Sequence, residues 1–337
     1  MKVTCFPSIL QALSCPEETN ERTFKLEKVI LLKPYFSHTI WGGTKIREEF
    51  GYDEPGEDIG ECWGISAHPT GESVAEGGEY DGMKLSTLWE EHRELFGNAE
   101  GDRFPLLVKI IDAKDDLSIQ VHPDDEYASK YENGSLGKKE CWYILDCPEG
   151  GELVVGHNAK TRDELSDMID SGRWDELIRR VKVHPGDLVQ IDPGTVHAIT
   201  KGVCVLETQQ SSDITYRLYD YGRLQNGKPR PLHLQQSKDV ITVPAPDAED
   251  QITRESENGT APVTELISCD KYKVCSVKVS GNMELDTDAP FLNVTVVKGK
   301  GKVFGQEVKK GNFLLVTKEG TGKLELSGDM ELIVSRV

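Results

Sequence analysis

Four side chains that can bind a metal ion stand out in the middle of the chain. Two of them, Gln120 and His122, are separated by one residue in the segment 118–123, where polar and apolar residues alternate. Alternate residues of a β-strand point to the same face, so a strand here would place both side chains together. Glu140 opens the next apolar run, and His197 closes a later one. If these strands converge, the four residues hold one divalent cation through mixed nitrogen and oxygen ligands.

Turn-forming residues stand where such strands would begin and end. Pro123 lacks a backbone N–H for a strand ladder, so the first strand should end there. Polar residues and glycines fill 132–139, before the strand that Glu140 opens. His197 follows the segment 185–194, which has a Pro-Gly turn at each end of a short apolar run. An unpaired buried carboxylate is costly, which favours metal binding by Glu140.

Length and charge limit the classes of partner. The chain has 337 residues, which exceeds one typical domain and favours one larger and one smaller domain. Its formal net charge of −19 argues against nucleic acid as a partner, because phosphate backbones are bound by a surplus of Lys and Arg. The sequence also lacks an apolar run of about 18 residues, so we expect no membrane span. No oligomeric state is indicated by the sequence.

The cysteines and the N-terminus bear on the cellular compartment. Eight cysteines without paired spacing are typical of reduced thiols. The first fifteen residues imitate a signal peptide only weakly, because Pro7 and Gln11 interrupt the apolar segment that such a peptide needs. We therefore expect a cytoplasmic protein.

The composition along the chain predicts four parts. Residues 1–27 form an N-terminal extension, and 28–243 form a metal-binding β domain with helical insertions. Residues 244–262 are rich in Pro, Asp, Glu and Gly and indicate a linker. In 263–337, short apolar runs alternate with glycine turns and no His occurs, which predicts a small β domain without a metal site.

Two segments of the larger domain have helical spacing. Apolar residues in 85–96 recur at helical intervals, and Gly97 is a typical stop. The segment 161–181 begins with a capping box of Thr161 and Glu164 and is interrupted near residue 172. We expect both to be helices.

The motifs together resemble those of the cupins and, within them, the type I mannose-6-phosphate isomerases, which are zinc-dependent. The resemblance rests on Gln-x-His-Pro at 120–123, Lys-x-Glu at 138–140 and Pro-Gly-x-x-His-Ala at 193–198. Further matching segments follow in family order: Trp41-Gly42-Gly43, Glu61-Cys62-Trp63, Ala67-His68-Pro69, 104–109 and 218–221. The likeness covers roughly 28–243 and continues more weakly to the end. The chain is similar to the short bacterial form, because it lacks the helical insertion of longer members, which have an aromatic residue where Ile199 stands.

The resemblance implies a fold, a cofactor and a reaction. The fold is mainly β, with a cupin (jelly-roll) barrel that includes helical segments and a second, smaller cupin-like β domain. The cofactor is one zinc ion per chain, bound by Gln120, His122, Glu140 and His197, although Gln120 can instead orient a ligand from outside the coordination shell. The reaction interconverts mannose 6-phosphate and fructose 6-phosphate by metal-assisted proton transfer between C1 and C2. The partner is then a small sugar phosphate.

Two basic residues and one acidic residue are the further candidates for catalysis. Arg217 matches a position that the family uses in its active site, where a guanidinium stabilises developing negative charge. The alternative for Arg217 is a salt bridge to Asp213 or Asp220. Lys138 can bind phosphate, polarise a hydroxyl group or transfer a proton, or it can be an exposed surface residue. Glu207 is either a general base or a partner that supports a lysine or arginine.

Two other functions would use the same ligands. Two histidines and one carboxylate with open positions also bind iron in dioxygenases. The additional Gln120, the Lys-x-Glu motif and the segment around Arg217 disfavour that reaction. The last alternative is a metal-containing, sugar-binding cupin without turnover, which an assay with mannose 6-phosphate would separate from the isomerase.

Overall fold

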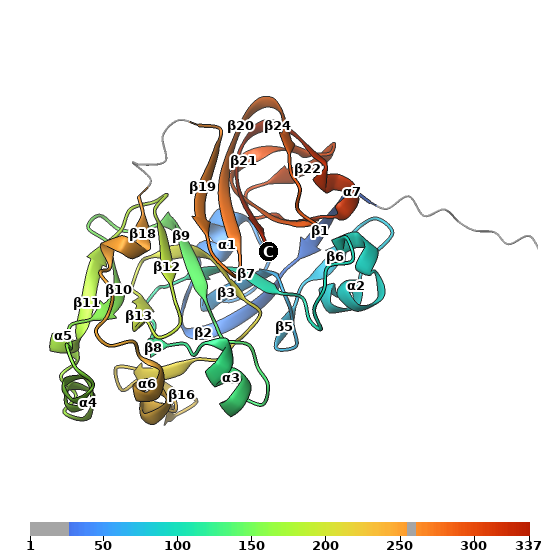
Figure 1. Ribbon diagram of the computed structural model, residues 1–337. Coiled ribbons are helices and arrows are strands. Elements are labelled where there is room, and N and C mark those ends of the chain that lie inside the picture. Colours follow the sequence, from blue (N-terminus) through green and yellow to red (C-terminus); the bar gives the residue numbers. More distant parts are fainter. Residues whose placement is uncertain (1–26, 255–260) are drawn as a thin grey trace, which may run out of the picture.

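The computed structural model describes residues 27–254 and 261–337 (Figure 1). The expected N-terminal extension, apart from its last residue, lies outside the described residues. The described chain is mainly β, as predicted, and its strands form three large sheets and two small two-stranded ones. In this part of the chain, no helix is long and apolar enough to cross a membrane.

Two of the large sheets pack face to face and hold the site between them. The seven-stranded sheet has the order β18 (Ile252–Thr253), β12 (Leu188–Ile191), β9 (Glu140–Asp146), β14 (Cys204–Gln210), β7 (Leu106–Asp112), β3 (Ile59–Ile65) and β2 (Tyr35–Gly43). The five-stranded sheet has the order β11 (Ile178–Lys182), β10 (Glu152–His157), β13 (His197–Ile199), β8 (Ile119–Val121) and β15 (Tyr216–Tyr219). An apolar cluster with Trp142 and Ile111 from the first sheet and Leu153 from the second fills the space between them. This arrangement confirms the predicted cupin-type fold.

The third sheet joins the two ends of the chain. Its order is β19 (Val263–Ser268), β20 (Lys273–Asp286), β24 (Lys323–Arg336), β21 (Leu292–Val303), β23 (Phe313–Val316), β1 (Val29–Lys33) and β6 (Val74–Glu76), and β22 (Gln306–Lys309) pairs with β21. Strand β1 therefore completes the C-terminal unit, where it appears in blue beside orange and red strands (Figure 1). Strand β18 lies in the segment expected to be a linker and pairs with β12. The division into four parts stays a prediction.

The first expected helix forms, and the second ends early. Helix α2 (Leu85–Glu91) and the 3₁₀ helix η1 (Arg93–Phe96) end at Gly97, whose φ is 61°. Helix α4 (Arg162–Asp170) begins as expected, because the Thr161 hydroxyl accepts from the backbone N–H of Glu164 at 3.2 Å. A short helix, α5 (Trp174–Leu177), follows. Beyond it the prediction of a helix up to residue 181 is wrong, because 178–182 form strand β11.

Shorter elements connect the sheets and cover their outer faces. They are α1 (Lys45–Phe50), β4 (Ala67–His68), β5 (Gly71–Glu72), α3 (Asp125–Tyr131), β16 (Leu224–Gln225), β17 (Lys228–Pro229), α6 (Leu234–Val240), η2 (Glu249–Gln251) and α7 (Lys318–Thr321). Residues of α4, α5 and α6 join β8 and β15 in a separate apolar cluster on the outer face of the five-stranded sheet. That outer cluster includes Ile119 and Val121, so the residues that alternate with them face the interior.

Candidate metal centre and active site

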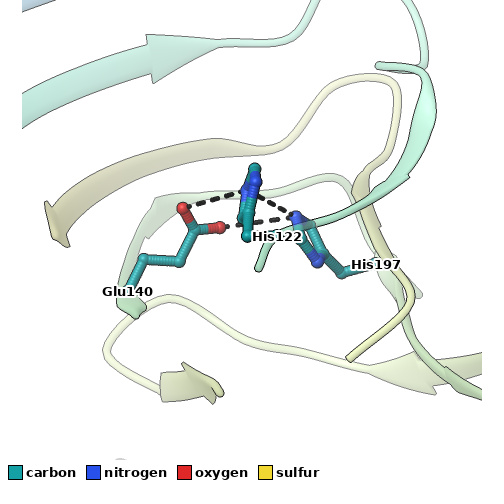
Figure 2. A group of neighbouring side chains, drawn as sticks. All are labelled: His122, Glu140 and His197. Atoms are coloured by element: carbon teal, nitrogen blue, oxygen red, sulfur yellow. Dashed lines mark hydrogen bonds and ion pairs between the residues drawn. The ribbon is translucent and has the colours of Figure 1, made fainter. Parts of the chain in front are cut away.

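Three of the predicted ligands converge between the two sheets. His122 follows β8, Glu140 opens β9 and His197 opens β13, and their side chains point toward one another (Figure 2). The ring nitrogens Nε2 of His122 and His197 are 3.1 Å apart, and each lies 3.5 Å from an oxygen of Glu140. All three side chains are buried, with at most 1% of each residue exposed. The structure thus brings together a His-Glu-His group.

Backbone carbonyls fix the orientation of both imidazoles. The Nδ1 atom of His122 donates to the carbonyl of Ile214 at 2.8 Å, and that of His197 donates to the carbonyl of Thr195 at 2.9 Å. Each ring therefore directs its unprotonated Nε2 atom inward, which is the usual arrangement of metal-binding histidines. Burial, and next the nearby Lys138 ammonium, lower the pKa of His122 to about 4. Burial also lowers the pKa of His197, so both rings are neutral and able to bind a cation.

The donor set fits a single divalent cation. Adjacent ligands about 2.0–2.1 Å from a tetrahedral ion lie roughly 3.3 Å apart, which matches the separations of 3.1–3.5 Å between the His122, His197 and Glu140 atoms. Within the described chain, the buried Oε1 atom of Glu140 has no hydrogen-bond partner. A buried carboxylate oxygen without a donor is costly unless a cation compensates it. Two imidazoles and one carboxylate also leave further positions open for substrate.

Gln120 lies beside this group. Strand β8 pairs Gln120 with His197 of β13, and the Gln120 Nε2 atom is 3.2 Å from the His197 Nε2 atom. The other amide atom, Oε1, accepts from the Ser118 hydroxyl at 3.4 Å. A half-turn of the amide exchanges the two atoms and directs the oxygen to the ligand group. Gln120 therefore stays a predicted ligand, adjacent to the three that converge.

Lys138 contacts two of the ligands. Its Nζ atom forms an ion pair with Glu140 and lies 3.1 Å from the Nε2 atom of His122. Only 4% of Lys138 is exposed, so a role as a solvated surface residue is excluded. Burial alone would raise the pKa of Glu140, but the Lys138 ammonium outweighs burial and holds that pKa well below its usual range. Glu140 is thus ionised and ready to bind a cation.

Glu207 supports two lysines. Its Oε1 atom is 3.2 Å from the Nζ atom of Lys109 and 3.6 Å from that of Lys138. The indole N–H of Trp142 donates to its Oε2 atom at 2.8 Å. Because both oxygens are engaged by cations or a donor, the geometry favours the supporting role over that of a general base.

Lys109 extends the row of charges and was given no role by the sequence analysis. Its Nζ atom donates to Glu61 at 3.3 Å in addition to its contact with Glu207. Burial would lower the pKa of Lys109, yet Glu207 and Glu61 outweigh burial and raise it, so the side chain is charged. The signal was present in the sequence, because a lysine inside the apolar strand 106–112 has to find buried partners.

A polar cavity of about 190 Å³ opens beside the ligand group. Gln120 and Lys138 line it on the ligand side, and Lys109, Arg217 and Arg230 contribute further cations. Other lining residues are Ser37, Thr39, Trp41, Glu61, Ile111, Leu117, Ser118, Trp142, Ile199, Glu207 and Thr215. Arg230 could not be predicted from the sequence, because it lies in a polar segment without a recognisable motif.

Arg217 does not form the alternative salt bridges. Its Nε atom donates to the Ser118 hydroxyl at 3.2 Å and Nη1 donates to the carbonyl of Pro231 at 3.0 Å. Asp220 pairs instead with Arg223 and Arg230. Among the described residues no ion pair of Arg217 occurs. Burial, and next the Arg230 charge, lower the pKa of this guanidinium, which is thus a partly desolvated cation in the cavity wall.

The two packed sheets and the buried His-Glu-His group define a metal-binding cupin-type protein. A family model for the phosphomannose isomerase type I catalytic domain matches residues 29–155, and one for the mannose-6-phosphate isomerase cupin domain matches residues 263–337. The chain is 50% identical to mannose-6-phosphate isomerase ManA of Bacillus subtilis over 91% of this chain and 98% of that protein. A mannose-6-phosphate isomerase of Streptococcus mutans is 45% identical over 91% of this chain and 97% of its own.

Solved structures agree with this assignment. The crystal structure of the mannose 6-phosphate isomerase from Bacillus subtilis superposes with a TM-score of 0.85 at 44% identity, covering 92% of this chain and all of that one. A structure of a mannosephosphate isomerase from Archaeoglobus fulgidus, described as putative, has a TM-score of 0.73 at 20% identity and shows the fold alone. The chain belongs to the type I phosphomannose isomerase family. The family resemblance seen in the sequence is confirmed.

Proposed function

We propose that the protein interconverts mannose 6-phosphate and fructose 6-phosphate at one zinc ion, bound by His122, Glu140 and His197 with Gln120 as a further ligand. The observation that carries the proposal is the buried His-Glu-His group beside a polar cavity lined by lysines and arginines. Relatives that bear the name mannose-6-phosphate isomerase align over nearly their whole length with this chain. Neither an iron dioxygenase nor a sugar-binding cupin without turnover is favoured by any of these features.

The choice of metal follows from the donors. Imidazole nitrogen and carboxylate oxygen with an open position are the ligands of catalytic zinc sites. When bound, a divalent cation supplies Lewis-acid stabilisation of the negative charge that develops on the substrate oxygens during enolisation. The protein contributes neutral imidazoles and one ionised carboxylate, which hold such an ion without burying excess negative charge.

In this proposal, Lys138 and Arg217 act on the substrate oxygens that are bonded to C1 and C2. Lys138 extends from the ligand group to the cavity and is placed to hold or transfer a proton at these oxygens. Arg217 is linked to Gln120 through the Ser118 hydroxyl, so its guanidinium lies near the ligands and stabilises developing negative charge. Glu207 holds Lys138 in position through the ion pair between their side chains.

The phosphate group would bind at the arginine end of the cavity. Arg230 and Arg223 share the buried Asp220, whose carboxylate accepts from Arg230 Nε at 2.7 Å and from Arg223 Nη2 at 2.5 Å. Two guanidiniums against one carboxylate leave an excess positive charge beside Arg217. Guanidinium groups bind phosphate in a bidentate manner, so this end of the cavity suits the 6-phosphate.

The cysteines support a cytoplasmic location for the protein. Six cysteines in the described part of the chain are free, which suits the reducing cytoplasm. The function is tested by a coupled assay that compares mannose 6-phosphate with unphosphorylated mannose, in parallel with metal analysis. We expect turnover of the phosphate ester and one zinc per active chain. Turnover of neither sugar by fully zinc-loaded protein would contradict the proposal.

A further inference from the structure

A turn of the C-terminal unit reaches the segment that carries Lys138. The turn spans 269–272, between β19 and β20, and the backbone N–H of Cys269 donates to the carbonyl of Tyr272 at 2.9 Å to close it. Three successive residues of this turn make contacts: Asp270 with Lys139 before β9, Lys271 with Asp125 of α3, and Tyr272 with Gln190 of β12. The C-terminal unit is therefore linked to the active site although its described residues supply no metal ligand.

The first contact fixes the residue after Lys138. The Nζ atom of Lys139 lies 2.6 Å from Asp270 Oδ1 and 3.5 Å from Asp192 Oδ1. The backbone N–H of Lys139 donates to the Gln210 side chain at 2.9 Å. Both the side chain and the backbone of Lys139 are thus fixed by contacts with neighbouring segments.

The second contact fixes the residue before Lys138. Lys271 Nζ lies 2.8 Å from Asp125 Oδ2, and Asp125 Oδ1 accepts from the backbone N–H of Gly137 at 2.8 Å. A side chain on Gly137 would collide with the backbone of Asp124 at 2.4 Å, so the two segments pack directly together here. The Gln210 amide also donates to Asp125 at 2.9 Å, which joins this contact to the first.

The third contact anchors the turn itself. Tyr272 is 1% exposed, and its hydroxyl donates to Gln190 Oε1 at 3.1 Å. Gln190 pairs with Cys141 in the ladder between β12 and β9, next to the pair of Ile191 with Glu140. The buried Tyr272 side chain therefore attaches the turn to the seven-stranded sheet, which includes the Glu140 strand.

We propose that Asp270 and Lys271 are positioning residues for Lys138, acting through its two chain neighbours. The proposal rests on the role of Lys138 in the isomerase reaction proposed above. Partly exposed ion pairs contribute little to stability, because solvent screens them. The reaction rate depends far more steeply than stability on where a catalytic group lies, since a shift of about 1 Å can cost ~10²-fold in rate. Loss of the two contacts should therefore reduce turnover without a matching loss of stability.

The test is the double variant Asp270→Asn/Lys271→Gln in the full zinc-loaded protein. We expect kcat for mannose 6-phosphate to fall about tenfold or more, with KM within about twofold, one metal per chain and a nearly unchanged melting temperature. The charge-preserving variant Asp270→Glu/Lys271→Arg should retain most of the activity. A role in folding alone would not separate these two variants at equal stability.

A matched control is available in the same unit. Lys310 pairs with Glu49 of α1 at 3.3 Å, and its side chain is 35% exposed, compared with 33% for Lys271. Lys310→Gln thus breaks a comparable contact between the C-terminal unit and the rest of the chain, away from Lys138. Its kcat should equal that of the wild type.

Each outcome decides between positioning and general stability. Unchanged kcat in Asp270→Asn/Lys271→Gln, or an equal loss in Lys310→Gln, would overturn the proposal, as would a loss that follows the melting temperature. Activity of the wild type toward mannose 6-phosphate in the same experiment separates the two proposals. If the wild type is active and the double variant is equally active, only the positioning role fails.

Discussion

Replacement of Lys109 by methionine tests how the row of buried charges is held together. The side chain of Lys109 is 8% exposed and lies between the carboxylates of Glu61 and Glu207, whose side chains are 16% and 3% exposed. Methionine keeps most of the volume and removes the charge, which leaves Glu207 in a buried site with one cation fewer. Removal of one partner from a buried ion pair typically costs about 3–5 kcal/mol.

The surroundings place the expected cost at the lower end of that range. Trp142 still donates to Glu207 at 2.8 Å, and Lys138 remains 3.6 Å away, so the carboxylate is not left without partners. We therefore expect Lys109→Met to lower the free energy of unfolding by about 3 kcal/mol, measured by urea denaturation of the zinc-loaded protein. Adding Glu207→Gln to Lys109→Met should recover more than about 1 kcal/mol of the free energy of unfolding. In the double variant, position 207 no longer carries a charge that needs the missing ammonium of Lys109. A single-variant cost below about 1 kcal/mol, or additive costs in the double variant, would refute this reasoning.

Three further predictions concern the cavity and the ligands. Arg217→Ala should lower kcat about 10²- to 10³-fold at unchanged zinc content, and Arg217→Lys should restore little because it lacks the planar fork; a change in KM alone would assign the residue to phosphate binding instead. Arg230→Ala should mainly raise KM for mannose 6-phosphate in steady-state assays, and an unchanged KM would place the phosphate elsewhere. Burial, and next Lys138, lower the pKa of His122 to about 4, so its imidazole stays neutral well below pH 6.5. Zinc content measured after gel filtration should therefore hold at pH 5 and fall only near pH 4. Loss of zinc already at pH 6 would contradict this prediction.

Part of the candidate site follows from local rules, and the family resemblance supplied the rest. Two-residue periodicity placed Gln120 and His122 on one strand face, and the cost of an unpaired carboxylate pointed to Glu140. Turn residues marked the strand that ends before His197. These local patterns marked candidates, the resemblance to the family joined them into one ligand set, and the structure gathers three of the four residues at a single point.

Features that depend on distant contacts were not predictable from local patterns. The segment 178–182 continues a helical pattern, but pairing with β10 makes it a strand, with Leu153 opposite Val181. The pairing of β1 with β23 unites segments from opposite ends of the chain, and no local signal indicates it. Arg230 stands in a polar segment and acquires its position only through Asp220, which the fold brings beside it.

In the proposed function, His122, Glu140 and His197 hold the one metal ion on which turnover depends. The most direct test measures zinc content and mannose 6-phosphate turnover together in the wild type and in Glu140→Ala, each before and after chelation and reloading. We expect one zinc per wild-type chain, loss of activity with the metal and recovery on reloading, and neither zinc nor activity in a folded Glu140→Ala protein. A Glu140→Ala protein that binds one zinc and turns over normally would contradict the account.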